Sequence, residues 1–69
     1  MKKYLVVYEQ TNKNYSAYSP DIPGCVATGT DYSEVKSNMK EAIQFHLEGL
    51  KEDGLPVPEP VSTTDYIEV

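Results

Sequence analysis

The sequence predicts a small α+β domain of the order β-β-β-α-β, in which one helix covers one face of an antiparallel sheet. Three observations indicate this class. A run rich in Val and Tyr, a polar turn and a second such run are typical of a hairpin. A Pro-Gly loop leads from this hairpin to a third short apolar run. A long stretch with helical spacing of apolar residues follows, and a proline-rich segment leads away from it.

The first predicted strand, Lys3 to Gln10, has apolar side chains on both of its faces. Tyr4, Val6 and Tyr8 share one face, and Leu5 and Val7 share the other. A strand of this kind is expected to be central and covered on both sides. The other strands are expected at Tyr15 to Ser19, at Cys25 to Thr28 and, with weaker alternation, at Ser62 to Val69.

The clearest predicted element is a helix from about Tyr32 to Asp53. Asp31 is a favourable N-cap, and Glu34 stands at the spacing of a capping box. Gly54 is a plausible stop, and Pro56 prevents continuation of the helix. The apolar stripe consists of Val35, Met39, Ala42, Ile43, Leu47 and Leu50. The helix is therefore amphipathic, with one face directed at the sheet.

The composition limits the functions that the chain can have. A length of 69 residues indicates one domain, and a net charge of −5 argues against nucleic acid as the direct partner, because phosphate binding needs Lys and Arg. The charge permits a basic protein as partner instead. The alternative is that a charge of this size only keeps the protein soluble, because modest net charge is ordinary. No apolar run is long enough for a membrane span. The lone cysteine excludes an internal disulfide and suits the reducing cytoplasm.

Few residues carry the pattern of a catalytic or metal site. His46 falls in the helical stripe without ligands at metal-binding spacing, so a packed or rim histidine is expected. Cys25 is expected to be a small buried hydrophobic residue. Gly49 borders the stripe, and close packing against another backbone would explain it. No catalytic residue, no metal and no cofactor are predicted.

One helix covers only one face of a sheet, and both faces of the first strand are apolar. Uncovered apolar sheet surface usually marks an interface. The sequence therefore predicts a homo-oligomer or an obligate partner.

Two motifs resemble the HicB antitoxin family. The first is the loop Pro20-Asp21-Ile22-Pro23-Gly24-Cys25, followed by Gly29 and the capped helix. The second is the helix exit Leu50-Lys51-Glu52-Asp53-Gly54-Leu55-Pro56-Val57-Pro58, with Glu41-Ala42 matching the helical Glu-Ala of the family. The resemblance covers roughly Tyr4 to Pro60.

The resemblance implies a partial RNase H-like fold and assembly into dimers or tetramers. It implies binding to HicA, a small ribonuclease that is similar to a double-stranded-RNA-binding domain and uses a catalytic His. Many members carry a second, C-terminal domain that binds operator DNA. No such domain follows within this sequence, so we expect a single HicB-like domain over residues 1–69 and no direct DNA binding.

An acidic partner is attracted to the basic groove of an RNA-cleaving toxin and covers it. Exposed tyrosines would supply anchors, because Tyr is enriched at interface hot spots. For Asp21, a local turn bond is the alternative to a partner contact. For Phe45, packing under the last strand is the alternative. The candidate partner-binding residues are Tyr8, Glu9, Tyr15, Tyr18, Asp21, Ile22, Glu34 and Phe45.

An RNase H-like nuclease and an orphan oligomer are the two alternatives to the antitoxin function. A working RNase H-like nuclease needs a carboxylate cluster around divalent metals, with an acidic residue inside the central strand. The run Tyr4 to Tyr8 contains none, which argues against an enzyme. The remaining alternative is an orphan HicB-like oligomer that binds or regulates something other than a toxin.

Overall fold

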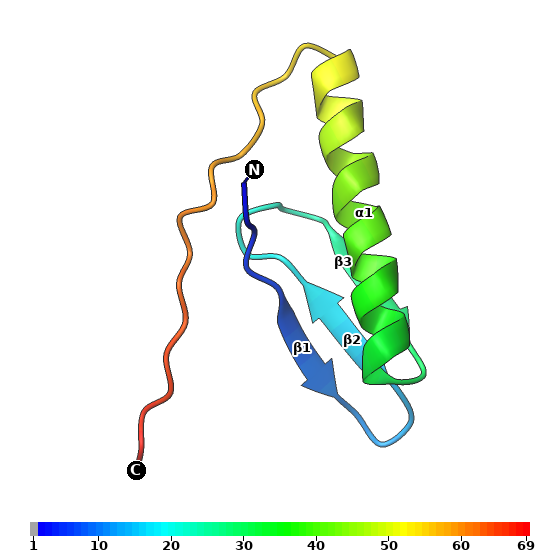
Figure 1. Cartoon of the computed structure of the whole chain (residues 1–69), viewed down its shortest axis with the longest axis vertical. Coiled ribbons are helices and arrows are strands. Elements are labelled where there is room, and N and C mark those ends of the chain that lie inside the picture. The colour runs from blue at the N-terminus through cyan, green and yellow to red at the C-terminus, as the bar shows by residue number, and fades with distance from the viewer. Residues whose placement is uncertain (1) are drawn as a thin grey trace.

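The computed structural model describes residues 2–69 and contains three strands and one helix. These elements follow in the order β1 (Val7–Gln10), β2 (Tyr15–Tyr18), β3 (Val26–Gly29) and α1 (Tyr32–Glu52). The strands form one antiparallel sheet in the order β1-β2-β3, and α1 lies against one face of it (Figure 1). The predicted α+β class, the hairpin and the single covering helix are confirmed. Within the described residues, no helix has the length and apolar character needed to cross a membrane.

β1 is shorter than predicted and begins at Val7 rather than at Lys3. Its register with β2 pairs Val7 with Tyr18 and Gln10 with Tyr15, so β2 ends opposite the first residue of β1. The residues before Val7 have no strand opposite them. Instead, the Ser19 hydroxyl donates a hydrogen bond of 2.8 Å to the Leu5 carbonyl. At this point a hydrogen bond from a side chain therefore takes the place of the backbone hydrogen bonds between strands.

The Pro-Gly loop forms the predicted turn. Gly24 has φ of 79°, which a type II turn requires at this position and which glycine adopts without steric cost. The Cys25 N–H donates to the Ile22 carbonyl at 3.1 Å and closes the turn. This turn directs Ile22 into the core, where it is fully buried.

Both ends of α1 are capped by local sequence. At the N-terminus, the Glu34 N–H donates to the Asp31 carboxylate at 2.8 Å, as predicted. The Glu34 carboxylate accepts from the Thr30 N–H at 2.9 Å, so the reciprocal bond closes one residue earlier than in a standard capping box.

At the C-terminus, Gly54 has φ of 70° and is the predicted stop. The Leu55 N–H donates to the Leu50 carbonyl at 2.9 Å, and the Gly54 N–H donates to the Lys51 carbonyl at 3.1 Å. These two bonds are those of a Schellman motif.

The core lies between α1 and two of the three strands. α1 packs over β3 and β2, whereas a groove remains between the helix and the side chains of Val6 and Tyr8 at β1. The buried apolar residues are Ala17, Ile22, Cys25, Val35 and Met39. The opposite face of the sheet is uncovered, and Val26 there is 65% exposed.

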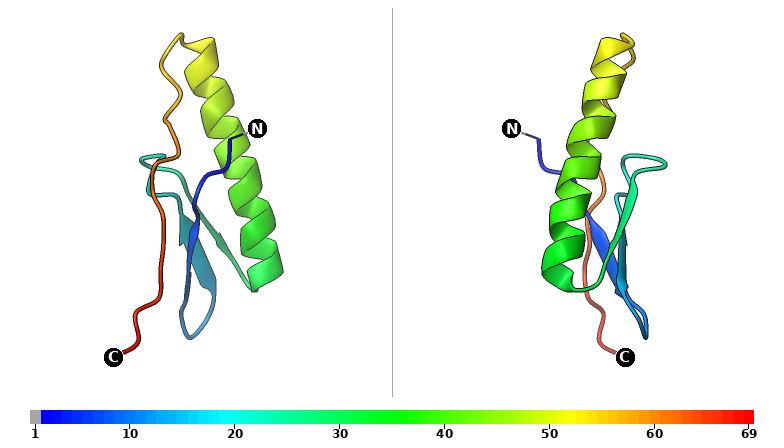
Figure 2. Two further views of the ribbon diagram at one scale, coloured as in Figure 1. Left: turned by 60° about the vertical axis from the view of Figure 1, so that its left-hand side comes forward. Right: turned by 90° about the vertical axis from the view of Figure 1, so that its right-hand side faces the viewer.

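The predicted last strand, Ser62 to Val69, is wrong for the single chain. Residues 55–69, here called the C-terminal segment, contain no strand and run extended beside β1 (Figures 1 and 2). The segment is anchored near its middle, where the Asp21 carboxylate accepts bonds of 3.1 Å and 2.8 Å from the Ser62 N–H and hydroxyl. Beyond that anchor, Tyr66 is 100% exposed and Ile67 is 83% exposed.

Two glycines should respond to alanine in opposite directions. A Cβ on Gly29 would lie 2.5 Å from the Val35 backbone nitrogen, whereas a Cβ on Gly49 would have no described atom within 4 Å. The expected close packing at Gly49 is therefore wrong. Gly29→Ala should lower the free energy of unfolding by about 1–3 kcal/mol through overpacking. Gly49→Ala should raise it by about 1 kcal/mol through helix propensity. Urea denaturation of both variants measures the difference, and equal effects would contradict the placement of α1.

Candidate functional site

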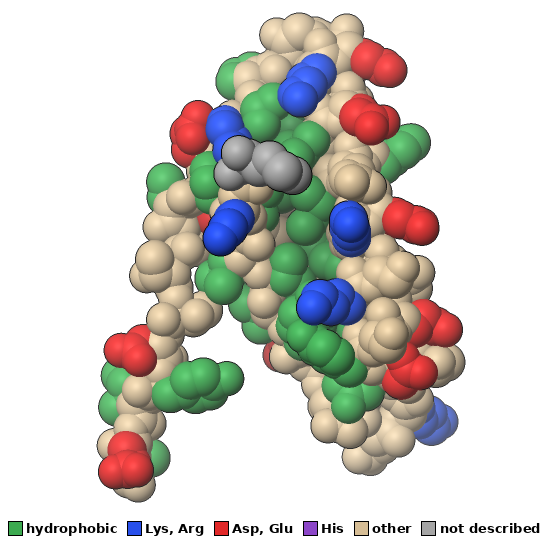
Figure 3. All heavy atoms as spheres, viewed as in Figure 1, with side chains coloured by type: hydrophobic (Ala, Val, Ile, Leu, Met, Phe, Trp, Pro, Cys, Tyr) green, Lys and Arg blue, Asp and Glu red, His purple; other side chains and the backbone are tan. Residues whose placement is uncertain are grey.

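The outer face of α1 carries a stripe of acidic side chains. Glu34, Glu41, Glu48 and Glu52 follow one another at intervals of seven, seven and four residues, which correspond to two turns or one turn of helix. All four are exposed, and Figure 3 shows acidic side chains along the edge of the molecule that α1 forms. Phe45 lies four residues after Glu41 in the same stripe and is 80% exposed. These five residues are called the acidic face.

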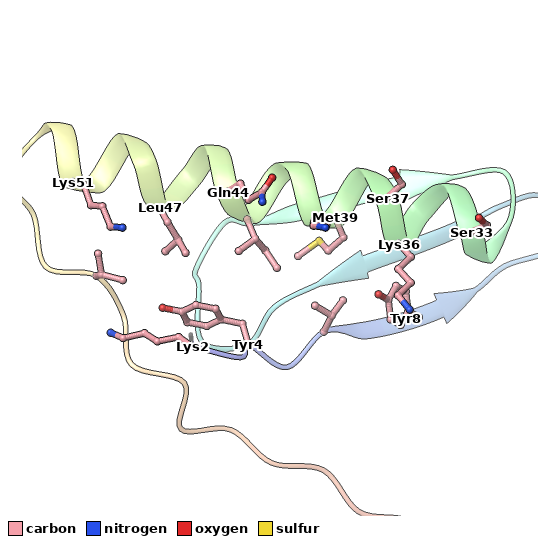
Figure 4. Close-up of a pocket in the computed structure, with 14 residues that line it drawn as sticks. Lys2, Tyr4, Tyr8, Ser33, Lys36, Ser37, Met39, Gln44, Leu47 and Lys51 are labelled. Carbon is pink, nitrogen blue, oxygen red and sulfur yellow. The ribbon is translucent and has the colours of Figure 1, made fainter.

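A groove lies on the other side of α1, between the helix and the chain leading into β1 (Figure 4). Its volume is about 890 Å³. The apolar floor consists of Tyr4, Val6, Tyr8, Met39, Ile43, Leu47 and Val57. Lys2, Lys36, Lys40 and Lys51 lie at its rim. Four of the six basic residues of the chain thus gather around this lysine groove.

The uncovered face of the sheet carries a third surface. The strand registers place Val7 opposite Tyr18 and Tyr18 opposite Val26, so the three side chains form one row. Tyr18 is 41% exposed and Val26 is 65% exposed. The sequence-based expectation that one face of the sheet keeps its own apolar set is confirmed.

The predicted tyrosines divide between the two faces of the sheet. Tyr8 and Tyr15 are partly buried against the core, whereas Tyr18 lies on the uncovered face. The Tyr8 ring meets Tyr32 edge-on, with ring centroids 4.9 Å apart. Burial, and secondarily the neighbouring Tyr32, raise the pKa of the Tyr8 hydroxyl, which stays neutral at physiological pH. Glu9 is exposed at the end of β1.

Two of the predicted contact residues have structural roles in the single chain. Ile22 is fully buried and does not reach the surface. Asp21 accepts both hydrogen bonds from Ser62, 41 residues away, so neither a free contact residue nor a local turn bond describes it. Glu34 also caps the helix start through Thr30, although its side chain remains exposed. Phe45 is exposed on α1 and does not pack under a last strand.

The structure adds residues that the sequence analysis missed. Glu41, Glu48 and Glu52 complete the acidic face around Phe45, and their helical spacing was the signal that could have found them. Ser19 is buried, and its hydroxyl donates a hydrogen bond to the Leu5 carbonyl. The two residues are 14 positions apart, and the sequence carries no local signal for this contact.

The chain offers little for metal or nucleophile chemistry. Among residues 2–69, no three His, Cys, Asp or Glu side chains lie close enough together to hold a metal ion. Cys25 is buried, as predicted, and burial raises the pKa of its thiol. The thiolate that nucleophilic attack requires is therefore disfavoured. His46 is partly buried on α1.

A three-stranded antiparallel sheet backed by one helix defines a small α+β domain, and this domain carries three separate exposed surfaces. Residues 4–68 match the family model of the HicB-like antitoxin of bacterial toxin-antitoxin systems. The chain belongs to this family.

The chain is also similar to two curated proteins and to one chain of a solved structure. A 14.9 kDa protein from the rep-hol intergenic region of Haemophilus phage HP1 is 41% identical over 64 residues, which are 93% of this chain and 48% of that protein. The chain therefore spans about half the length of this relative. A UPF0150 protein of Helicobacter pylori is 41% identical over 49 residues, 71% of this chain and 68% of that protein. A solved HicA3 and HicB3 toxin-antitoxin complex contains a chain that is 32% identical, with a TM-score of 0.73, covering 87% of this chain and 70% of that one.

Cys25 should react slowly with thiol reagents while the chain is folded. The side chain is 4% exposed and its thiol is held neutral, so reaction requires local opening. Ellman's reagent at mildly alkaline pH should label native protein at least about 100-fold more slowly than protein in denaturant. Because the folded-state pKa is raised, the free energy of unfolding should fall as pH rises past the pKa of the unfolded thiol. Equal labelling rates in the two states would contradict this burial.

Asp21 should control the order of the C-terminal segment. Asp21→Ala removes the acceptor for both Ser62 bonds, whereas Asp65→Ala removes only a bond to the neighbouring Tyr66 N–H. Amide exchange and proteolysis of residues 58–66 should accelerate in Asp21→Ala and stay unchanged in the control. An unchanged exchange rate in Asp21→Ala would show that this anchor does not order the segment.

Proposed function

We propose that this chain is the antitoxin of a type II toxin-antitoxin pair, and that it binds and blocks a HicA-type, mRNA-cleaving ribonuclease. The observation that carries the proposal is the acidic face of α1, in which the exposed Phe45 lies in one stripe with four glutamates, between Glu41 and Glu48. Membership in the HicB-like antitoxin family and the fold shared with a chain of a HicA-HicB complex support it.

The electrostatic part of the mechanism follows from what the toxin needs. A ribonuclease binds phosphate with Lys and Arg, so its RNA-binding surface is basic. A stripe of glutamates on a rigid helix is attracted to such a surface and accelerates encounter. Once bound, the helix occupies the space that the RNA backbone requires. Inhibition then needs no chemistry on the toxin.

Phe45 supplies the anchor at the centre of this surface. An aromatic side chain surrounded by charged residues has the arrangement of an interface core with a polar rim. The phenyl ring of Phe45 is 80% exposed in the free protein. Burial of this ring against a partner would therefore add hydrophobic free energy to binding. The position on a helix adds precision, because the backbone of α1 is capped at both ends and does not have to order on binding.

The proposal assigns no catalytic residue to this chain. A nuclease reading would centre on Glu9, which lies exposed at the end of β1 and belongs to no group of three metal-ligating side chains within residues 2–69. The proposal implies that both proteins act in the cytoplasm, where mRNA is the substrate of the ribonuclease.

An orphan role as an oligomeric binding protein is the second candidate. The row of Val7, Tyr18 and Val26 favours it, because this apolar surface lies away from the acidic face and requires no toxin. The two roles differ in whether a HicA-type ribonuclease is bound.

Co-expression with a HicA-type ribonuclease, taken from the neighbouring gene where that gene encodes one, tests the proposed function. The antitoxin role predicts that the ribonuclease alone arrests growth, that this chain restores growth, and that the two proteins purify together. Growth arrest that persists in the presence of this chain, with no complex, would remove the antitoxin role and leave the orphan role.

Phe45→Ala should weaken the complex with the ribonuclease by at least about tenfold, as expected for an interface anchor. Val26→Ala is the matched control, because it truncates another exposed apolar side chain on the opposite face of the sheet. Isothermal titration calorimetry of both variants measures the two dissociation constants. Equal affinity of Phe45→Ala and the control would place the interface elsewhere.

The charge of the acidic face should act mainly on the association rate. Glu41→Lys combined with Glu48→Lys should slow association and reduce its dependence on salt, because it removes steering towards a basic surface. Stopped-flow measurement at low and high salt tests this, with Lys36→Glu on the other side of α1 as control. A rate in the Glu41→Lys, Glu48→Lys variant that is unchanged at low salt would contradict steering by this face.

A further inference from the structure

α1 covers only part of the sheet, and the lysine groove lies where a second helix would extend the same layer. A helix with its side chains is about 10 Å wide, and neighbouring strands lie about 5 Å apart. One helix therefore covers about two strands, which here are β3 and β2. The lysine groove runs along the remaining width, between α1 and the chain that leads into β1 (Figure 4). Its place in the fold suits an occupant of helical dimensions.

The floor of the lysine groove offers the apolar contact that a docked helix needs. Met39, Ile43 and Leu47 line the groove from α1 at intervals of about one helical turn, and Val6 and Tyr8 line it from the opposite side. Figure 3 shows hydrophobic side chains along this hollow, with lysines beside them. Except for Met39, these five residues are only partly buried in the single chain. An apolar stripe laid over them would remove further apolar surface from water.

The rim of the lysine groove indicates the charge of the occupant. Lys36, Lys40 and Lys51 lie on the groove side of α1, and all three are exposed. Lys36 and Lys51 are separated by a length of about 22 Å along the helix. Among the described residues, the ion pair at the rim is that of Lys2 with Glu59, so the three helix lysines have no carboxylate partner there. A row of positive charge on one side of a long apolar floor is complementary to a row of acidic side chains.

We propose that the lysine groove docks an acidic amphipathic helix of a partner protein. The partner helix lies alongside α1, directs its apolar stripe at the floor, and carries Glu or Asp on the flank that meets the helix lysines. A helix of about 15 residues spans the distance from Lys36 to Lys51. This is recognition of a helix in a groove, in which the apolar floor provides most of the affinity and the lysines fix the orientation.

Two other occupants fit the lysine groove less well. The acidic face of a second copy offers glutamates, but its one apolar side chain, Phe45, does not match a floor that apolar residues line along its whole length. A small amphiphilic anion would meet only part of a lysine row that extends over about 22 Å. Pockets for small ligands also bury most of the ligand surface, whereas this groove is open along one side. An acidic helix uses both the floor and the full row of lysines.

A synthetic helix tests the groove on the full chain. The probe is a fluorescein-labelled peptide of about 15 residues, with Leu in the apolar stripe, Glu on both flanks and Ala elsewhere. Fluorescence anisotropy should show binding to the wild type at micromolar concentration, and replacing every Leu by Ser should abolish it. Amide chemical shifts should change at Val6, Ile43 and Leu47 and stay constant at Phe45. A peptide that stays unbound, or that shifts Phe45 instead, would overturn the proposal.

Reversal of the groove charge should reverse the peptide preference. Lys40→Glu combined with Lys51→Glu should weaken binding of the acidic peptide at least about tenfold. The same peptide with Lys in place of every Glu should bind this variant more tightly than it binds the wild type, which also shows that the variant is folded. Lys3→Glu with Lys13→Glu is the matched control, because it changes the net charge equally at exposed positions that do not line the groove. An equal loss of affinity in the control would show unspecific charge attraction and overturn the proposal.

The same titration identifies the other occupants. If a second copy fills the groove, the apparent affinity for the peptide should fall as the protein concentration rises. If the groove serves a small amphiphilic anion, dodecanoate below its micelle concentration should bind to the wild type while the peptide does not. Either result would overturn the proposal.

The lysine groove and the acidic face lie on different sides of α1, so this proposal stands apart from the ribonuclease. Lys40→Glu with Lys51→Glu should leave the affinity for the ribonuclease unchanged, and Phe45→Ala should leave the affinity for the peptide unchanged. A chain that binds no ribonuclease would still bind the peptide, and a chain that binds no peptide would still bind the ribonuclease. The failure of one proposal is therefore distinguishable from the failure of the other.

Discussion

The approach of α1 to β3 determines the rest of the structure. Gly29 ends β3, only two residues precede the helix, and the Gly29 backbone lies so close to Val35 that a Cβ has no room. The start of α1 is thereby fixed over the far edge of the sheet from β1. One helix cannot cover three strands from that position, so it covers β3 and β2. The open side of β1 and the lysine groove follow from this single constraint.

The same constraint assigns different chemistry to the two sides of α1. The buried stripe of Val35 and Met39 faces the sheet, which leaves the glutamates and Phe45 outward and the lysines towards β1. The net charge of −5 is therefore unevenly distributed: glutamates gather on the outer side of α1, and lysines gather on the side towards β1. One side of the helix suits a basic partner, and the other suits an acidic segment. A small domain can in this way carry two interfaces that do not compete, because the helix itself separates them.

Local sequence predicted the features that depend on local bonds. The N-cap at Asp31, the turn at Gly24 and the stop at Gly54 all rest on contacts within five residues, and all are present. The pairing of Asp21 with Ser62 and of Ser19 with Leu5 depends on the folded path of the chain. No spacing rule reports such contacts, so the bonds between Asp21 and Ser62 are not predictable from local sequence. The exposure of Phe45 is not predictable either, because it depends on where the C-terminal segment runs.

The incorrect last strand has a different cause. Residues 62–69 carry the alternation of a strand, but alternation describes only what one segment offers, and a strand exists only when a second edge accepts its backbone bonds. In the single chain the anchor at Ser62 holds that segment away from the free edge of β1. Alternation therefore describes residues 62–69 correctly, and the anchor that keeps the segment from pairing lies 41 residues away in sequence, where no local pattern reports it.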